Sequence, residues 1–192
     1  LVANKNAGLK TLADLKGKHL ATQVGTGMHT VLLMLLQKQG LKASDFNITN
    51  LRVVDMPAAM ESADNIDAVL GWEPSIQRIV QAGKGKVMLT SGQLQTMAGI
   101  TYPFLVTTTV AYHKEHPDIV QKLMNGYAKA DKFITTHHDE TVQIYLDEIQ
   151  RRGAKLSKED IQLMLFDNVD RFGAAAFTTA DMQDLNATLA YM

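Results

Sequence analysis

The chain has 192 residues, of which 46% are hydrophobic, so it can bury the core of one domain or of two small ones. Its formal net charge of -1 provides no broad basic field for nucleic acid or an anionic membrane, and we expect no nucleic-acid partner. The absence of cysteine excludes disulfides, thiol catalysis and thiolate metal sites, and no apolar run approaches the ~20 residues of a membrane span.

The first half of the chain alternates strand and helix signals. It opens on a strand-like run without a methionine, which we interpret as a fragment or a processed chain whose targeting signal lies outside it. Thr11 and Asp14 form a capping-box pattern, and Gly17 provides a stop. Strands are predicted over residues 19–23, 51–54, 66–71 and 86–89, and helices over 28–39, 57–62 and 74–82. This order predicts an α/β fold with a mostly parallel sheet and helices on its faces.

The second half changes character after a boundary that we place at residues 100–103. A long β-rich run predicts one strand over residues 104–112. Beyond it, helices are predicted from Pro117, from Asp139 and Glu140, from the capping box of Ser157 and Asp160 through residue 166, and over 180–190 after Thr179. One strand is too little sheet to stand alone, so we expect its partner strands in chain that this sequence lacks.

The segment Gly25-Thr26-Gly27-Met28-His29-Thr30 is the first candidate site. Its two glycines allow a tight turn, and the helix start behind them leaves unpaired N–H donors and the positive end of the helix dipole. This combination predicts an anion-binding site, with His29 as a hydrogen-bond donor. An ordinary strand-to-helix turn is the alternative. The segment has neither the Gly-x-x-x-x-Gly-Lys-Ser/Thr pattern of a nucleotide-phosphate loop nor the third glycine of a dinucleotide fold.

A second candidate, Gly71-Trp72-Glu73-Pro74, follows the predicted strand over residues 66–71. Ligands of parallel sheets gather at the carboxyl ends of strands, so this segment and the glycine turn are expected to face one crevice. Trp72, the single tryptophan, would form a flat apolar wall with an N–H donor. The alternative is that Trp72 is a core or hinge residue and Glu73 a carboxylate at a helix start.

No arrangement for catalysis or metal binding stands out elsewhere. The histidines within residues 113–116 and 137–138 lack the spacing and third ligand of a metal site, and we expect them to be solvated or to cap helices. The serines at Ser62, Ser75 and Ser91 have no nucleophile elbow around them. We therefore predict no catalytic residue, no metal and no cofactor.

Three stretches in order resemble one protein family. Residues 9–18, Leu-Lys-Thr-Leu-Ala-Asp-Leu-Lys-Gly-Lys, resemble the "s-l-a-D-L-K-G-K" opening of the second lobe of periplasmic solute-binding proteins. The turn at 25–30 resembles the "G-S/T-S-A-H" turn of the nitrate/sulfonate/taurine branch, which includes the thiamine-pyrimidine binders. Residues 66–74 resemble its "D-A-x-x-x-W-x-P", and His116-Pro117 matches the start of its long return helix. The resemblance covers most of the chain.

The resemblance implies a bilobal, type II periplasmic-binding-protein-like fold. Residues 9–101 would form a complete second lobe. Residues 1–8 and 102–192 would supply the crossover strands and the C-terminal helical part of the first lobe, whose N-terminal part is missing here. The function implied is that of an extracytoplasmic solute-binding component of an ABC importer, and not of an enzyme. It would be periplasmic or extracellular, with a lipid anchor in the missing N-terminus as one option, monomeric, and partnered by a membrane permease.

The implied ligand is a small anionic or polar organic solute of the sulfonate, taurine, nitrate or thiamine-pyrimidine type. Its predicted contacts are Gly25, Thr26, Gly27, Met28, His29, Trp72 and Glu73. The sequence departs from the family pattern twice, because Gly27 replaces a small hydroxyl residue and Glu73 stands where aspartate is common. The acidic Glu73 would favour a ligand that also carries an amine or a ring N–H.

Two alternatives share this fold. One is the ligand-sensing domain of a regulator or receptor, such as the effector domain of LysR-type regulators, which residues 14–18 and 72–74 fit poorly. The other is an enzyme like the fungal thiamine-pyrimidine synthases. Those enzymes use a cysteine-rich signature, and this chain has no cysteine.

Overall fold

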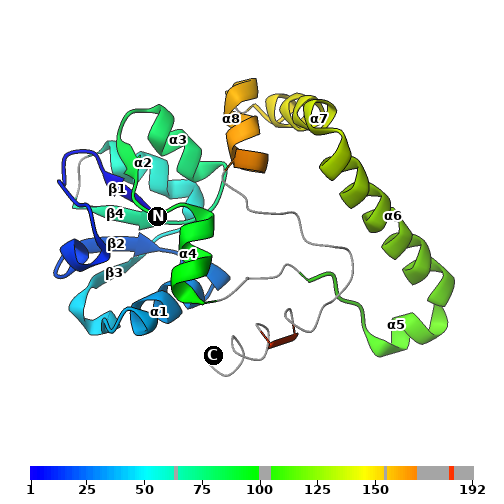
Figure 1. Cartoon of the computed structure of the whole chain (residues 1–192), viewed down its shortest axis with the longest axis horizontal. Helices are drawn as coiled ribbons and strands as arrows, with labels where there is room; N and C mark the ends of the chain where they lie inside the picture. Colours follow the sequence, from blue (N-terminus) through cyan, green and yellow to red (C-terminus); the bar gives the residue numbers. More distant parts are fainter. Residues whose placement is uncertain (63–64, 100–104, 154, 168–181, 184–192) are drawn as a thin grey trace. The chain divides into compact units, whose positions relative to one another are not determined.

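The structure is a computed structural model that describes residues 1–62, 65–99, 105–153, 155–167 and 182–183 (Figure 1). The chain divides into two compact units, the first comprising residues 1–102 and 186–192 and the second residues 103–185. Within the described ranges, no helix is both long enough and apolar enough to cross a membrane.

The first unit is built on a five-stranded sheet with the order β3-β2-β4-β1-β5. Its strands are β1 (Val2–Asn4), β2 (His19–Thr22), β3 (Asn47–Asn50), β4 (Ala68–Leu70) and β5 (Gly85–Val87). β2 pairs in parallel with both β3 and β4, whereas β1 is antiparallel to both β4 and β5. Four strands therefore share one direction, as the predicted mostly parallel sheet requires, and β1 runs against them.

Helices cover both faces of this sheet (Figure 1). They are α1 (Gly27–Lys38), α2 (Met56–Glu61), α3 (Ser75–Gln81) and α4 (Ser91–Ala98), with 3-10 turns η1 (Leu12–Leu15), η2 (Ala43–Asp45) and η3 (Val53–Asp55). Because side chains alternate along a strand, Leu20 packs with α1 and α4 on one face and Ala21 packs with α2 and α3 on the other. The two apolar clusters hold the carboxyl ends of β2 and β4 side by side.

The strand predicted over residues 51–54 is wrong. The strand that pairs with β2 on this side is Asn47–Asn50; residues 51–52 are irregular, and Val53 begins the 3-10 turn η3. β3 lies at an edge of the sheet and its side chains are exposed or half-buried, so its polar residues are tolerated there. Val53 is buried because the turn packs it against the α2 and α3 side of the sheet.

The second unit is helical in its described part. It contains α5 (Val110–Glu115), α6 (Pro117–Thr136), α7 (His138–Arg151), α8 (Lys158–Gln162) and the π-helical turn η4 (Leu163–Asp167). A small core joins α7, α8 and η4 around Val142, Leu156, Ile161 and Met164. The helices predicted from Pro117, Asp139 and Ser157 are confirmed, and the predicted helix over 180–190 falls almost wholly outside the described residues.

The strand predicted over residues 104–112 is also wrong in its described part. Residues 105–109 are irregular, and Val110 begins α5. Thr109 caps this helix, because its Oγ1 accepts a hydrogen bond of 3.1 Å from the Tyr112 N–H. No strand of the second unit's described residues is available as a partner, so the β-branched run has no ladder to join.

The α6 helix presents an apolar side to solvent. None of its residues is buried, and Ile119, Leu123, Met124 and Tyr127 are among the large exposed side chains of the chain. A helix with such a stripe is normally packed against another element. The described residues leave this side open.

Candidate functional site

The carboxyl edge of the sheet in the first unit brings the two predicted segments together. Thr22 at the end of β2 lies opposite Asn50 of β3 and Leu70 of β4. The glycine turn follows Thr22, and the Gly71–Glu73 segment follows Leu70, so both leave neighbouring strands at the same edge. This is the edge at which ligands of parallel sheets bind.

The N-terminus of α1 is open. Thr26 occupies the N-cap position, but its hydroxyl donates to the Gln23 carbonyl oxygen at 2.6 Å and does not cap the helix. Within the described residues, no acceptor is recorded for the N–H groups of Gly27, Met28 and His29. The starts of α4, α5 and α8 are each capped by a Thr or Ser hydroxyl, whereas α2, α6 and α7, like α1, have no side-chain cap among the described residues. The first turn of α1 therefore presents three uncommitted donors at the positive end of its dipole.

The turn before α1 is held from the next strand. Gly25 has a φ of 81°, a conformation that glycine adopts without the steric cost of a side chain. The Val24 N–H donates to Asn50 Oδ1 at 3.0 Å, and the Val53 N–H donates to Gln23 Oε1 at 3.1 Å. Two amide side chains thus fix the path of the chain into the open helix start.

Trp72 is 44% exposed at the end of β4, which excludes the interpretation of this residue as part of the core. Glu73 is half-buried, and its Oε2 accepts a hydrogen bond of 2.8 Å from the Gln77 N–H in the first turn of α3. The carboxylate therefore serves a helix start, as the alternative interpretation expected. Burial raises the pKa of Glu73, and the hydrogen bond from the Gln77 N–H opposes that shift.

The raised pKa of Glu73 predicts a pH-dependent stability. Because the folded pKa lies above the ordinary 4.5, the stability linked to this proton is full below pH 4.5 and is lost as the pH rises through the folded pKa. Glu73→Gln keeps an acceptor for the Gln77 N–H and removes the charge. We expect the variant to become more stable than the wild type as the pH approaches neutrality. Urea unfolding of both proteins from pH 4 to 7 tests this. A variant less stable than the wild type at neutral pH would show that the hydrogen bond to the charged carboxylate contributes more to stability than its burial costs.

Thr22 carries a hydroxyl with no hydrogen-bond partner among the residues that the structure describes, and its side chain is completely buried. A buried, unpaired hydroxyl destabilises the folded state. Thr22→Val, which replaces the hydroxyl by a methyl group, should raise the free energy of unfolding by about 1 kcal/mol. Thr22→Ser keeps the hydroxyl and should not. A less stable valine variant in chemical denaturation would show that the hydroxyl is bonded in solution.

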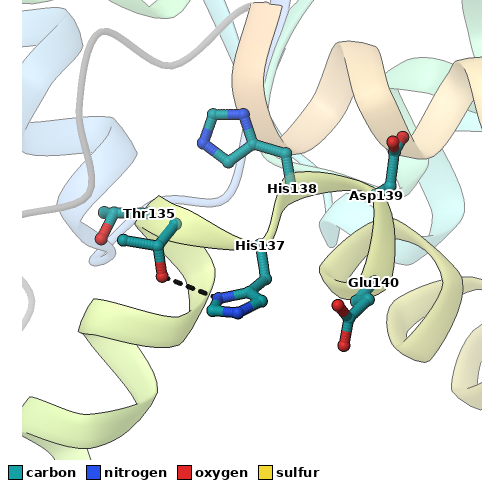
Figure 2. Close-up of a pocket in the computed structure, with 6 residues that line it drawn as sticks. Thr135, His137, His138, Asp139 and Glu140 are labelled. Atoms are coloured by element: carbon teal, nitrogen blue, oxygen red, sulfur yellow. Dashed lines mark hydrogen bonds between the residues drawn. The ribbon is translucent and has the colours of Figure 1, made fainter.

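The histidines form no convergent site. His29 is half-buried in the first turn of α1, beside the three open N–H groups. Figure 2 shows the hollow at the α6–α7 turn, where the exposed His137 and His138 point to opposite sides. The His137 ring stacks on Phe133, and the His138 ring stacks on Phe166 at a centroid distance of 4.2 Å. Across the described ranges, no group of three or more potential ligands could hold a metal ion.

Sequence reasoning missed two residues of this edge, Gln23 and Asn50. Both act through side-chain amides that bind backbone N–H groups of the neighbouring segment. Their position could have been inferred only with β3 correctly assigned, because Asn50 is the last residue of that strand. Polar residues that end adjacent parallel strands are the signal that was available.

Comparison with protein families and curated proteins identifies relatives. The profile described as "NMT1/THI5 like" matches residues 1–141. A protein of Escherichia coli K12 named for binding aliphatic sulfonates is 27% identical over 144 residues, which cover 75% of this chain and 43% of that protein. A protein of Bacillus subtilis 168 with the same kind of name is 27% identical over 147 residues, or 77% of this chain and 43% of that protein. The match spans less than half the length of these relatives.

Solved structures with the same fold include two binding proteins. The periplasmic aliphatic sulphonate binding protein SsuA of E. coli has a TM-score of 0.72 and 21% identity, covering 99% of this chain and 62% of its own. The alkanesulfonate-binding protein SsuA of Xanthomonas axonopodis pv. citri, solved with bound MOPS, has a TM-score of 0.73 and 23% identity, covering 98% and 60%. The predicted periplasmic-binding-protein-like fold is confirmed.

Proposed function

Because the chain belongs to the NMT1/THI5-like family, we propose that it is the solute-binding part of an ABC importer that captures a small organic anion. The anion would be of the sulfonate type, and the N–H groups of Gly27, Met28 and His29 would receive its charged head group. The open first turn of α1, at the carboxyl edge of a parallel sheet, is the observation that carries this proposal. Relatives named for sulfonate binding support it.

Each predicted contact residue would make a different kind of interaction with the ligand. Gly25 and Gly27 allow the ligand to approach the backbone, and His29 would add a side-chain donor. The Thr26 hydroxyl already donates a hydrogen bond to the Gln23 carbonyl oxygen. Thr26 would therefore contact the ligand only through its backbone or through its hydroxyl oxygen as an acceptor. Glu73 would stand near a ligand amine, with one oxygen already bonded to Gln77.

Exposed apolar side chains at the same edge favour a ligand with an organic part over nitrate. Val24, Val54 and Trp72 follow β2, β3 and β4, and are 44%, 70% and 44% exposed. Since these strands are neighbours, the three side chains would provide an apolar surface near the donors of α1. An alkyl or aryl group would bury apolar area against this surface, whereas nitrate has no apolar area to bury.

The proposal includes the organisation and the partners that the family implies. Residues 9–101 would form one lobe. Residues 1–8, whose β1 pairs with β4 and β5 in the sheet of that lobe, would be a crossover segment, and residues 102–192 would supply the return crossover and the helical part of the other lobe. The protein would act outside the cytoplasm, in the periplasm or at the cell surface, and would deliver its solute to a membrane permease. No observation favours the regulator or the enzyme as a second candidate function.

Titration calorimetry of the full-length protein tests the proposal. The probes are butanesulfonate, ethanesulfonate, taurine, nitrate and the aminopyrimidine of thiamine. We expect butanesulfonate to bind more tightly than nitrate, and taurine to gain relative to ethanesulfonate if Glu73 meets its amine. A folded protein that binds none of these compounds would overturn the function, and preferential binding of nitrate would overturn the organic ligand class.

A further inference from the structure

Asn50 lies where three parts of the candidate site meet. It ends β3, it is paired with Thr22 of β2, and its Oδ1 accepts the Val24 N–H at 3.0 Å. Val24 directly precedes Gly25, whose positive φ turns the chain toward α1. The Asn50 side chain therefore binds the residue that immediately precedes the glycine turn, and this turn leads to the free N–H groups of α1.

From this geometry we propose that Asn50 is a positioning residue of the anion site, an inference that rests on the proposed function. Its side-chain oxygen holds the Val24 N–H and thereby keeps the glycine turn in the form that presents Gly27, Met28 and His29 to a ligand. Asn50 itself does not need to touch the ligand to perform this role.

Further hydrogen bonds transmit the constraint along the turn. Gln23 accepts the Val53 N–H through its side chain and the Thr26 hydroxyl through its carbonyl oxygen. The Thr26 carbonyl oxygen in turn accepts the Thr30 N–H, which is the first hydrogen bond of α1. The turn is thus tied to η3 on one side and to α1 on the other, with Asn50 between them. A turn preorganised in this way loses less freedom when an anion binds.

A second asparagine on the same strand provides a matched control. Asn47 begins β3, is exposed like Asn50, and donates through its side chain to the Gly17 carbonyl oxygen at 2.9 Å. That bond lies at the opposite end of the strand, away from the candidate site. Asn47→Ala and Asn50→Ala each delete one exposed side-chain hydrogen bond, so a merely structural role would give both variants the same effect.

The first measurement is the affinity of the full-length protein for butanesulfonate by calorimetry. Asn50→Ala should weaken binding about two- to tenfold, the range expected for losing one hydrogen bond, and Asn47→Ala should leave it unchanged. Equal affinity of wild type and Asn50→Ala would overturn the proposal. Equal losses in the two variants would also overturn it, because they would show a general effect of weakening β3.

The second measurement is amide hydrogen exchange without ligand, which a failure of the proposed function does not affect. Val24 and the residues through His29 should exchange faster in Asn50→Ala and at the wild-type rate in Asn47→Ala. Asn50→Asp retains an oxygen acceptor and should restore the protection of Val24, while its negative charge keeps butanesulfonate binding weak. Unchanged exchange in Asn50→Ala would contradict the positioning role. Absence of butanesulfonate binding by the wild type would overturn the function itself.

Discussion

Thr26→Asp should lower the affinity for an anionic ligand about 100-fold or more while leaving the fold intact. The new carboxylate would stand at the N-cap of α1 and accept the N–H groups that the ligand would use. Two like charges about 4 Å apart at a protein surface repel by roughly 4 kcal/mol. The aspartate cap contributes about 0.5 to 2 kcal/mol, which offsets the lost hydroxyl bond to Gln23. Calorimetry with butanesulfonate and urea unfolding measure the two effects separately.

Thr26→Ala is the control for this prediction. It removes the hydroxyl without adding a charge, so its affinity should stay within a few-fold of the wild type and its stability should fall by about 1 kcal/mol. Binding by Thr26→Asp at the wild-type level would mean that anions do not meet the start of α1. An aspartate variant that fails to fold would contradict the expected capping.

Leu35→Ala should cost the first unit about 2 to 5 kcal/mol of unfolding free energy. Leu35 is completely buried in α1 and belongs to the apolar cluster that joins this helix to β2, β4 and α4. Truncation removes its transfer free energy and leaves a cavity in the packing that holds α1 against the sheet. Trp72 is the single tryptophan and lies in the first unit, so its fluorescence in urea reports the unfolding of that unit.

Gln37→Ala tests whether the loss comes from packing. Gln37 is exposed on the same helix, so its replacement should change the unfolding free energy by no more than about 0.5 kcal/mol. Similar losses in the two variants would mean that helix propensity governs this region. A Leu35→Ala loss below about 1 kcal/mol would contradict the cluster as the basis of stability in the first unit.

Helix starts and stops were predictable from the sequence because local chemistry determines them. Gly17 adopts a positive φ angle where the sequence pattern predicted a helix stop. The capping boxes of Thr11 with Asp14 and of Ser157 with Asp160 are present. The buried face of α1 also follows directly from its periodicity.

Strands were less predictable, since a strand exists only with a partner. Residues 51–54 are more apolar than β3, yet it is β3 that pairs with β2. Residues 105–112 have the composition of a strand but no partner within the described part of the second unit, and the Thr109 cap then favours a helix. Composition alone does not say which neighbour a segment will meet.

The sequence predicted which segments form the candidate site, but not the side-chain hydrogen bonds that hold these segments in place. The glycine turn and the start of α1 follow from local sequence, and the edge that they share with Trp72 follows from strand order. The contact between Asn50 and Val24 depends on the register of β2 against β3. Register is a long-range property, so local patterns do not contain it.

The antiparallel β1 has a consequence for the order in which this sheet can form during synthesis. Val2 is paired with Val69 of β4 and with Val87 of β5, and among the described strands β5 has β1 as its only neighbour. At roughly 5 to 20 residues per second, the ribosome needs about 4 to 17 seconds to make the chain between Val2 and Val87. The parallel strands β2, β3 and β4 can assemble within this interval, while the apolar β1 still lacks the hydrogen-bond partner that β5 provides. Among the described strands of this sheet, the one that precedes the others in sequence is thus the one whose pairing is completed last.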